Sequence, residues 1–252
     1  MLEAFSISDI GKKREINQDC VEVSVTAVGN LPNLLLLADG MGGHKAGDYA
    51  SRFAIDTVKN EVNVSPETNP VHIFAEAIEY ANGHLYEKSI SNINYQGMGT
   101  TLVAATCDDH KLSVANIGDS RLYLIRQNKM VQVTRDHSYV AELVQKGGLD
   151  KETAKNHPKK NYITRAVGAF EKANADYFYV ETKPEDVILI CSDGLTNMLS
   201  DEEILSIIYQ EHDLEFTCTK LVQAANEKGG FDNISVILAK VLAAGKENLI
   251  YD

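Results

Sequence analysis

The sequence predicts an α+β fold with largely antiparallel sheets, and three observations support this class. Short apolar runs that are typical of strands recur along the chain, two long tracts carry apolar residues at helical spacing, and several neighbouring strands are joined by very short loops. Such loops fit hairpins, whereas parallel strands need a crossover of about a dozen or more residues. No long-period repeat divides the 252 residues, a length that suits one large domain or two small ones.

Strands and helices can be assigned in chain order from these patterns. Strands are expected at residues 4–10, 21–26 and 34–38, because each is a short apolar run. Helices are expected at residues 46–63 and 71–93, where apolar side chains recur every three or four positions on both sides of the loop SPETNP.

The rest of the chain begins with hairpins and then alternates between strands and helices. The expected strands there are residues 100–107, 112–117, 122–126, 130–132, 176–180, 187–191 and 234–241. The expected helices are residues 201–209 and 215–228. Residues 136–161 are helical and polar and contain the breakers Gly147, Gly148 and Pro158, which indicates an excursion from the core.

Charge and composition exclude several classes of protein. Asp and Glu number 36 against 24 Lys and Arg, a formal net charge of −12, which argues against a nucleic acid partner because phosphate backbones require a basic surface. No run approaches the roughly 18 apolar residues of a membrane span, and the N-terminal residues lack the apolar stretch of a signal peptide. The four cysteines have neither metal-ligand nor redox spacing. We therefore expect a cytoplasmic protein with reduced thiols.

Five aspartates stand at the ends of expected strands. LLLLADG at 34–40 recurs as VILICSDG at 187–194, so that Asp39 and Asp193 each follow a buried strand, while Asp19 and Asp232 each precede one. In antiparallel sheets the start of one strand lies beside the end of its neighbour, so these four carboxylates can meet at one end of the sheets. Asp119 follows the strand that ends in VANIGDS.

Such a cluster favours a divalent metal ion. Clustered carboxylates repel one another and are costly to desolvate unless cations lie between them. Oxygen ligands suit hard ions such as Mg²⁺ or Mn²⁺, and glycines beside the aspartates let a substrate approach. A single Asp-Gly pair is ordinary turn chemistry. The metal hypothesis therefore depends on several such positions being brought together by the fold.

Eight motifs in order carry a family resemblance. They are SDIGKKREINQD (8–19), LLLLADGMGGHKAG (34–47), GMGTTLVAA (97–105), VANIGDSRLYLIR (114–126), TRDHS (134–138), HPKKNYITRAVG (157–168), VILICSDGLTNML (187–199) and GGFDNISVI (229–237). Over about nine-tenths of its length the sequence resembles the metal-dependent Ser/Thr protein phosphatases, the PPM or type 2C family, in their compact bacterial form.

The resemblance implies a fold and a domain organisation. It implies a four-layer αββα sandwich, in which two antiparallel sheets are flanked by helices, with a helical flap insertion. The catalytic domain is expected to span residues 1–245, with the flap at 136–161 and a tail at 246–252.

The resemblance also implies a binuclear centre of Mn²⁺ or Mg²⁺. Asp39 is expected to bridge two tightly bound ions, and the Gly40 carbonyl to ligate one of them. Asp193 and Asp232 are expected to hold the other ion, and Asp19 to support the centre directly or through water.

Two further residues complete the expected site. Asp119 corresponds to a ligand of a third, weaker ion, which we expect to be more exposed and to share Asp193, and Arg14 corresponds to the phosphate-binding arginine. Met41 stands where larger relatives have a histidine proposed as the general acid, and His44, three residues on, is at least as well explained as an ordinary loop residue.

The implied activity is hydrolysis of phosphoserine and phosphothreonine by metal-activated water. Arg14 and Asp39 are the expected catalytic residues, and the expected partners are phosphoproteins and a eukaryotic-like Ser/Thr kinase that modifies them, with the enzyme acting as a monomer. Two alternatives stay open: a hydrolase of small phosphoesters on the same fold, and an inactive scaffold. Comparing the turnover of a phosphopeptide with that of a free phosphometabolite distinguishes the first alternative from a protein phosphatase. Missing metal aspartates would mark the second, and none is missing.

Overall fold

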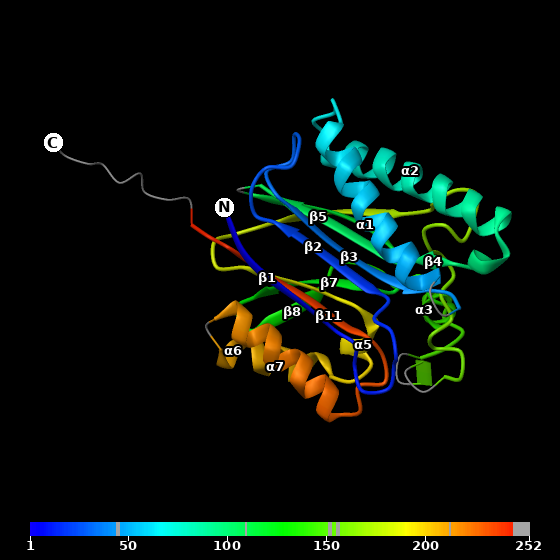
Figure 1. The fold of residues 1–252 in the computed structure, drawn as a ribbon. Coiled ribbons are helices and arrows are strands. Elements are labelled where there is room, and N and C mark those ends of the chain that lie inside the picture. Colours follow the sequence, from blue (N-terminus) through cyan, green and yellow to red (C-terminus); the bar gives the residue numbers. More distant parts are fainter. Residues whose placement is uncertain (44–45, 109, 151–152, 155–156, 212, 244–252) are drawn as a thin grey trace.

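The computed structural model describes residues 1–43, 46–108, 110–150, 153–154, 157–211 and 213–243. Two sheets lie face to face, and helices cover the outer face of each (Figure 1). The strands are β1 (Leu2–Asp9), β2 (Asp19–Ser24), β3 (Leu34–Met41), β4 (Gly99–Thr100), β5 (Leu102–Cys107), β6 (Lys111–Ile117), β7 (Arg121–Arg126), β8 (Lys129–Gln132), β9 (Asp176–Glu181), β10 (Val187–Cys191) and β11 (Ile234–Val241). The helices are α1 (Ala46–Val64), α2 (Pro70–Ser91), the short η1 (Ile93–Tyr95), α3 (Tyr139–Gln145), α5 (Asp193–Thr196), α6 (Asp201–Gln210) and α7 (Leu214–Glu227).

Strand pairing gives one sheet in the order β1-β11-β10-β7-β8 and another in the order β2-β3-β5-β6-β9, with β4 added to β3. The pairings between these strands are antiparallel. The expected β7–β8 hairpin forms through Gln127 and Asn128, whose positive φ angles of 48° and 61° suit a type I′ turn. The predicted four-layer sandwich of two antiparallel sheets is confirmed.

Alternation along β3 divides its side chains between two cores. Leu34, Leu36 and Ala38 pack with residues of α1 and α2, whereas the two leucines between them lie in the core between the sheets. Because successive side chains on a strand point to opposite faces, Asp39 continues the row between the sheets. The most apolar strand of the chain therefore carries a carboxylate to one end of the space between the sheets.

The outer helices have different partners. α1 and α2 cover the sheet that contains β3, and α6 and α7 cover the sheet that contains β11 (Figure 1). Among the described residues, none of the helices is both long and apolar enough to cross a membrane.

Three expectations about local structure need correction. The strand expected at 34–38 continues to Met41, because β4 pairs with Gly40 and Met41, so Asp39 lies inside a strand rather than beyond its end. The strand expected at 100–107 is divided into β4 and β5. Asp193 begins the short helix α5, which the sequence pattern did not predict.

The flap and the tail are described only in part. Within residues 136–161 the structure gives bounds for one helix, α3, capped by the Ser138 hydroxyl. Residues 151–152 and 155–156 of the expected flap lie outside the described residues, as do His44 and the whole of the tail expected at 246–252.

Candidate functional site

Asp19 and Asp39 are direct neighbours across two antiparallel strands. Asp19 begins β2 and is paired in register with Asp39 on β3. Side chains opposite each other in such a pair have Cβ atoms about 4.5–5.5 Å apart. Val21 and Val23 of β2 pack into the core between the sheets, so Asp19, two positions before Val21, lies on the same face. Both carboxylates therefore belong to the space between the sheets.

The other sheet supplies Asp193 and Asp232. Asp193 follows β10, Asp232 precedes β11, and these strands are antiparallel neighbours. Gly194 lies against the backbone of Asn233, since a Cβ atom on Gly194 would be 1.9 Å from the Asn233 carbonyl oxygen. The close packing of these two backbone segments brings Asp193 and Asp232 to the same end of the sandwich.

Asp119 follows a tight turn at the end of β6. Gly118 has a φ of +110°, and a Cβ atom there would lie 2.5 Å from the Thr101 methyl group. Ser120 and Thr101 share a hydrogen bond of 2.7 Å between their hydroxyl oxygens, and Thr101 Oγ1 accepts a hydrogen bond of 2.9 Å from the Asp39 N–H. Only 8% of Asp119 is exposed. Because Gly118 packs closely against Thr101, the turn that carries Asp119 is buried.

The five aspartates influence one another electrostatically. The pKa of Asp39 is raised well above its usual value, first by burial and then by the charges of Asp19, Asp193, Asp119 and Asp232. Burial is also the largest cause that raises the pKa of Asp19 to about 7 and that of Asp193 to about 6. Burial, followed by the charge of Asp193, raises the pKa of Asp119. Without a cation, this concentration of negative charge is therefore unfavourable.

Carboxylate oxygens in this cluster lack donors that their burial would require. The Oδ1 atoms of three aspartates are buried without a hydrogen-bond partner: those of Asp19, Asp119 and Asp193. Buried polar atoms are satisfied in most proteins, and a hard divalent ion is a ligand that such oxygens suit. Among the described residues, however, no three Asp, Glu, His or Cys side chains are already arranged as a closed ligand set. To bind an ion, these side chains would have to rotate, or waters would have to complete the coordination shell.

Arg14 and Gly40 lie at the edge of the cluster. Arg14 Nη2 donates a hydrogen bond of 2.7 Å to Asp232 Oδ2, and 49% of the Arg14 side chain is exposed. Gly40 donates from its N–H to the Gln18 carbonyl at 3.0 Å, and a Cβ atom on Gly40 would lie 2.1 Å from the Gly47 carbonyl oxygen. The structure thus brings all seven candidate residues to one end of the two sheets.

Comparison with known proteins identifies the family. The family model described as Protein phosphatase 2C matches residues 11–242. The chain belongs to the protein phosphatase 2C family. It is 39% identical over 248 residues to Protein phosphatase PhpP of Streptococcus pneumoniae, with 95% of this chain and 98% of that protein covered.

Solved structures agree with this assignment. The phosphatase matches the structure of Serine/threonine phosphatase Stp1 from Staphylococcus aureus with a TM-score of 0.90, 35% identity and 96% of both chains covered. It also matches the catalytic domain of the serine threonine protein phosphatase PstP in complex with two manganese ions, with a TM-score of 0.84 and 32% identity, covering 96% of this chain and 99% of that one.

Sequence reasoning did not find Ser192 as a supporting residue of the phosphatase, and it gave the motif residue His137 no specific contact. Ser192 joins the two sheets at the site, because its Oγ donates to Asp19 Oδ2 at 2.8 Å and accepts from the Ser235 N–H at 3.0 Å. His137 holds the turn before Asp119, since its Nδ1 accepts from the Gly118 N–H at 3.1 Å. Burial lowers the pKa of His137 and favours the neutral ring that this contact needs. The position of Ser192 directly before Asp193 was the one feature of the sequence that could have indicated its supporting role.

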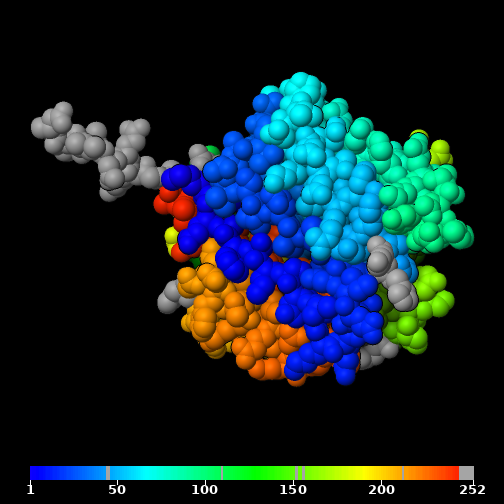
Figure 2. Space-filling view, viewed as in Figure 1, coloured from blue at the N-terminus to red at the C-terminus, as the bar shows by residue number. Residues whose placement is uncertain are grey.

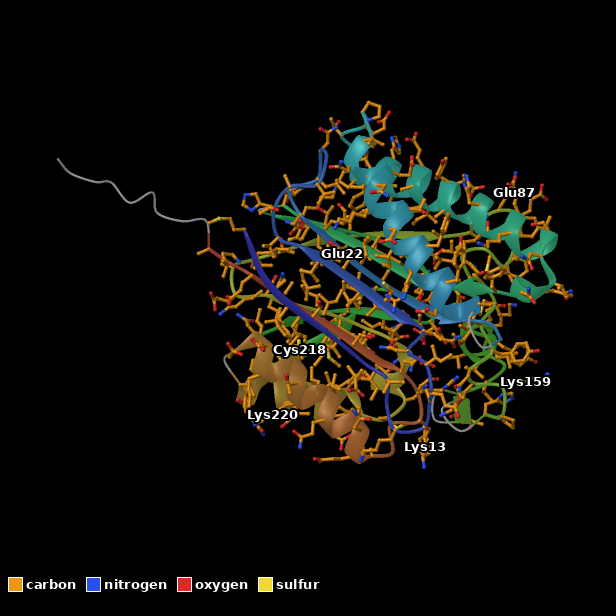
Figure 3. All side chains as sticks on the ribbon, viewed as in Figure 1. Lys13, Glu22, Glu87, Lys159, Cys218 and Lys220 are labelled. Carbon is orange, nitrogen blue, oxygen red and sulfur yellow. The ribbon has the colours of Figure 1, made fainter. Side chains whose placement is uncertain are left out.

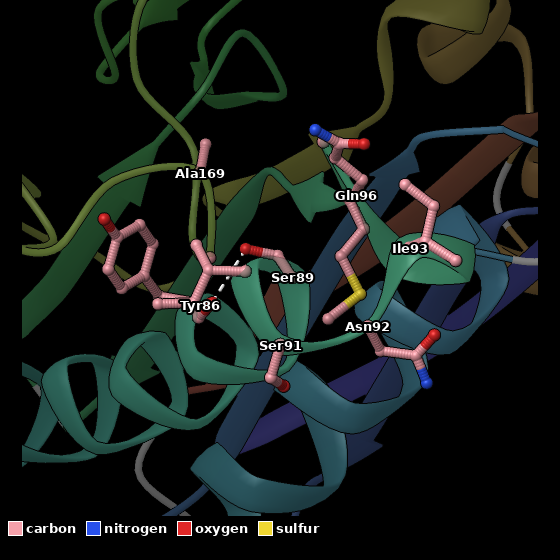
Figure 4. A pocket seen from close by; sticks show the side chains of 11 residues that line it. Tyr86, Ser89, Ser91, Asn92, Ile93, Gln96 and Ala169 are labelled. Carbon is pink, nitrogen blue, oxygen red and sulfur yellow. Dashed lines mark hydrogen bonds between the residues drawn. The ribbon is translucent and has the colours of Figure 1, made fainter.

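A separate cavity of the phosphatase lies away from the carboxylates. It has a volume of about 510 Å³ at the C-terminal end of α2, and its walls include Tyr86, Ile93, Gln96 and Ala169 (Figure 4). Within α2, Ser89 Oγ donates a hydrogen bond of 2.8 Å to the Tyr86 carbonyl oxygen. Its lining residues are uncharged, and none of the seven candidate residues of the site is among them.

Proposed function

We propose that this protein serine/threonine phosphatase hydrolyses phosphoserine and phosphothreonine at the common end of its two sheets, with Mn²⁺ or Mg²⁺ as the cofactor. In this proposal two tightly bound ions would be held by the residues of the cluster: Asp39 would be a ligand shared by both, the Gly40 carbonyl would serve one, and Asp193 and Asp232 would serve the other. Asp19 supports the centre directly or through water. The proposal depends mainly on one observation, the three buried carboxylate oxygens of this cluster that have no hydrogen-bond donor. The manganese complex of the related PstP catalytic domain supports the choice of metal.

The residues of the chain have distinct tasks in this proposal. Residues 34–38 of β3 are fully buried and hold Asp39 in a fixed position, while the Ser192 hydroxyl orients Asp19. Arg14 uses one guanidinium nitrogen on Asp232, and its remaining donors are available for two oxygens of a phosphoryl group. We propose that Arg14 binds the substrate phosphate in this way.

Bound divalent ions supply Lewis acidity, which lowers the pKa of water and offsets the charge of the phosphoryl group. Met41 follows the first Asp-Gly pair and has no proton to donate. The proton of the leaving group therefore comes from water in this proposal.

Metal dependence on a phosphopeptide tests the proposed function. A phosphothreonine peptide should be hydrolysed with Mn²⁺ or Mg²⁺, lose all measurable turnover in excess chelator, and be hydrolysed again when the ion is restored, with released phosphate as the measurement. Full turnover by a thoroughly metal-stripped sample would contradict the mechanism. Turnover of free phosphometabolites without any turnover of phosphopeptides would instead favour the small-phosphoester hydrolase.

Asp119 is proposed to hold a third, weaker ion together with Asp193. Its Oδ1 is buried without a partner, and it lies on the turn after β6, whereas the residues proposed for the two tight ions lie on β3 and next to β10 and β11. Asp119→Ala should therefore leave the two tightly bound ions in place and lower kcat by about 10- to 100-fold. Calorimetric titration with Mn²⁺, run beside steady-state kinetics, measures both effects. Loss of the tight ions in this variant would show that Asp119 belongs to the central pair.

We also propose that the phosphatase acts in the cytoplasm as a monomer, on proteins modified by a eukaryotic-like Ser/Thr kinase, and that residues 136–161 form a flap beside the site. The free thiols of Cys20, Cys107, Cys191 and Cys218 are consistent with a reducing compartment. Light scattering in solution tests the monomer, and dephosphorylation of kinase-modified proteins tests the substrate class.

A further inference from the structure

The loop that connects β1 to β2 is held firmly over the start of β11. Gly11 has a φ of +77°, and a Cβ atom there would lie 2.1 Å from the Asp232 carbonyl oxygen. The Lys12 N–H donates to the Gly230 carbonyl at 2.8 Å. The Asn233 amide donates to the Ile10 and Ile16 carbonyls at 2.9 and 3.1 Å. Residues 10–16, here called the GKKR loop, are therefore built onto the backbone that carries Asp232.

Two lysines of this loop have no visible structural task. Lys12 and Lys13 are exposed, and within the described part of the chain neither forms an ion pair with a carboxylate or a contact with an aromatic ring. Arg14, the next residue, is paired with Asp232. The N-terminal segment lies on the surface between the two helical layers (Figure 2), and the Lys13 side chain projects from the loop into solvent (Figure 3).

The charge of these lysines contrasts with the rest of the molecule. The chain has a formal net charge of −12, and the neighbouring site contains five aspartates. An acidic substrate would be repelled by most of this surface. Adjacent lysines also repel each other, so two unpaired cations on a fixed loop favour an anion supplied from outside.

The distance of the two lysines from Arg14 determines which residues of a bound phosphopeptide they can contact. Consecutive Cα atoms are about 3.8 Å apart, so the Cα atoms of Lys13 and Lys12 lie within about 4 and 8 Å of that of Arg14. An extended peptide advances about 3.3 Å per residue. With a phosphate held by Arg14, long lysine side chains can therefore meet residues about two to four positions from the phosphorylated one.

We infer that Lys12 and Lys13 form a subsite that selects phosphoprotein segments with acidic side chains close to the phosphorylated residue. This inference rests on the proposed function, because the phosphate at Arg14 fixes the position of the peptide. The lysines take part in substrate binding and not in the chemical step.

A pair of phosphothreonine peptides tests this subsite, one with two glutamates within four residues of the phosphothreonine and one with glutamines in their place. Wild-type enzyme should prefer the acidic peptide. Lys12→Gln/Lys13→Gln should raise KM for the acidic peptide by about 3- to 10-fold, as expected for two exposed ion pairs, with kcat unchanged. KM for the neutral peptide and turnover of a small aryl phosphate should not change. High salt should reduce the wild-type preference.

Two further variants sharpen the test. Lys129→Gln/Lys183→Gln makes the same change in net charge at exposed positions at the opposite end of the sheets and should have no effect on the preference. Lys12→Glu/Lys13→Glu should reverse the preference toward a peptide with lysines in place of the glutamates. Equal effects on acidic and neutral peptides, or an equal effect of the control variant, would overturn the subsite while leaving the phosphatase function intact. Absence of turnover on every phosphopeptide, with the aryl phosphate still hydrolysed, would overturn the proposed function and the subsite together.

Discussion

Asp39→Asn is expected to lower the turnover of a phosphopeptide by about 10³-fold or more, because it removes the charge of the residue proposed to bridge both ions. The same variant should make the metal-free protein more stable at pH 7. The pKa of Asp39 is raised well above its usual value by burial and by the neighbouring aspartates, and asparagine removes the charge that this environment disfavours. The free energy of unfolding should therefore increase, as measured by denaturant titration in excess chelator.

The pH dependence of stability gives this prediction a second measurement. A carboxyl group whose pKa is higher in the folded than in the unfolded protein binds more protons when folded, so stability falls as pH rises. With the pKa of Asp193 raised to about 6 and that of Asp19 to about 7, the metal-free protein should lose stability between about pH 4 and pH 7. Asp39→Asn should reduce this loss. Asp56→Asn, an exposed change on α1, is the matched control and should alter neither turnover nor the pH profile. Unchanged turnover in Asp39→Asn would contradict the proposed role of this residue.

Gly40→Ala is expected to destabilise the protein by more than about 4 kcal/mol or to prevent folding. The added Cβ atom would lie 2.1 Å from the Gly47 carbonyl oxygen and 2.7 Å from the Gln18 carbonyl oxygen, and both are backbone atoms that cannot move independently. Thermal unfolding in excess chelator measures this effect without any contribution from metal binding.

Gly43→Ala provides a control within the same glycine-rich stretch. A Cβ atom on Gly43 would have no neighbour within 4 Å. Its effect on the free energy of unfolding should stay within about 0.5 kcal/mol, as for an ordinary surface substitution. If Gly40→Ala were as mild as Gly43→Ala, the close approach of the Gly47 backbone would not be a constraint on this site.

The sequence predicted the strands well because each is a short apolar run, and it predicted the gathering of the aspartates because antiparallel topology brings strand starts and strand ends together. It could not predict contacts that depend on the exact placement of distant segments. Ser192 reaches Asp19 only because the two sheets pack face to face, and the Arg14–Asp232 pair joins residues 218 positions apart. The depth of Asp119 likewise follows from the packing of Gly118 against Thr101.

For the GKKR loop, the residue pattern and the family resemblance lead to different predictions. Lysines and an arginine in a row are typical of a solvated surface, and the resemblance assigned a task only to Arg14. The hydrogen bonds of Asn233 to the Ile10 and Ile16 carbonyls are what make the loop a fixed part of the site. No local pattern in the sequence could have predicted them.

The alternation of side chains along β3 also determines where the chain can change its length. Inserting or deleting one residue between Leu34 and Asp39 would exchange the two faces of the strand and move the carboxylate from the space between the sheets toward α1 and α2. The turn at Gln127 and Asn128 joins β7 to β8 at the end of the sheets away from the aspartates, so a change in its length would not move Asp39 to the other face of β3. Insertions and deletions among related chains should therefore collect in loops like this one, and the spacing from Leu34 to Asp39 should stay constant.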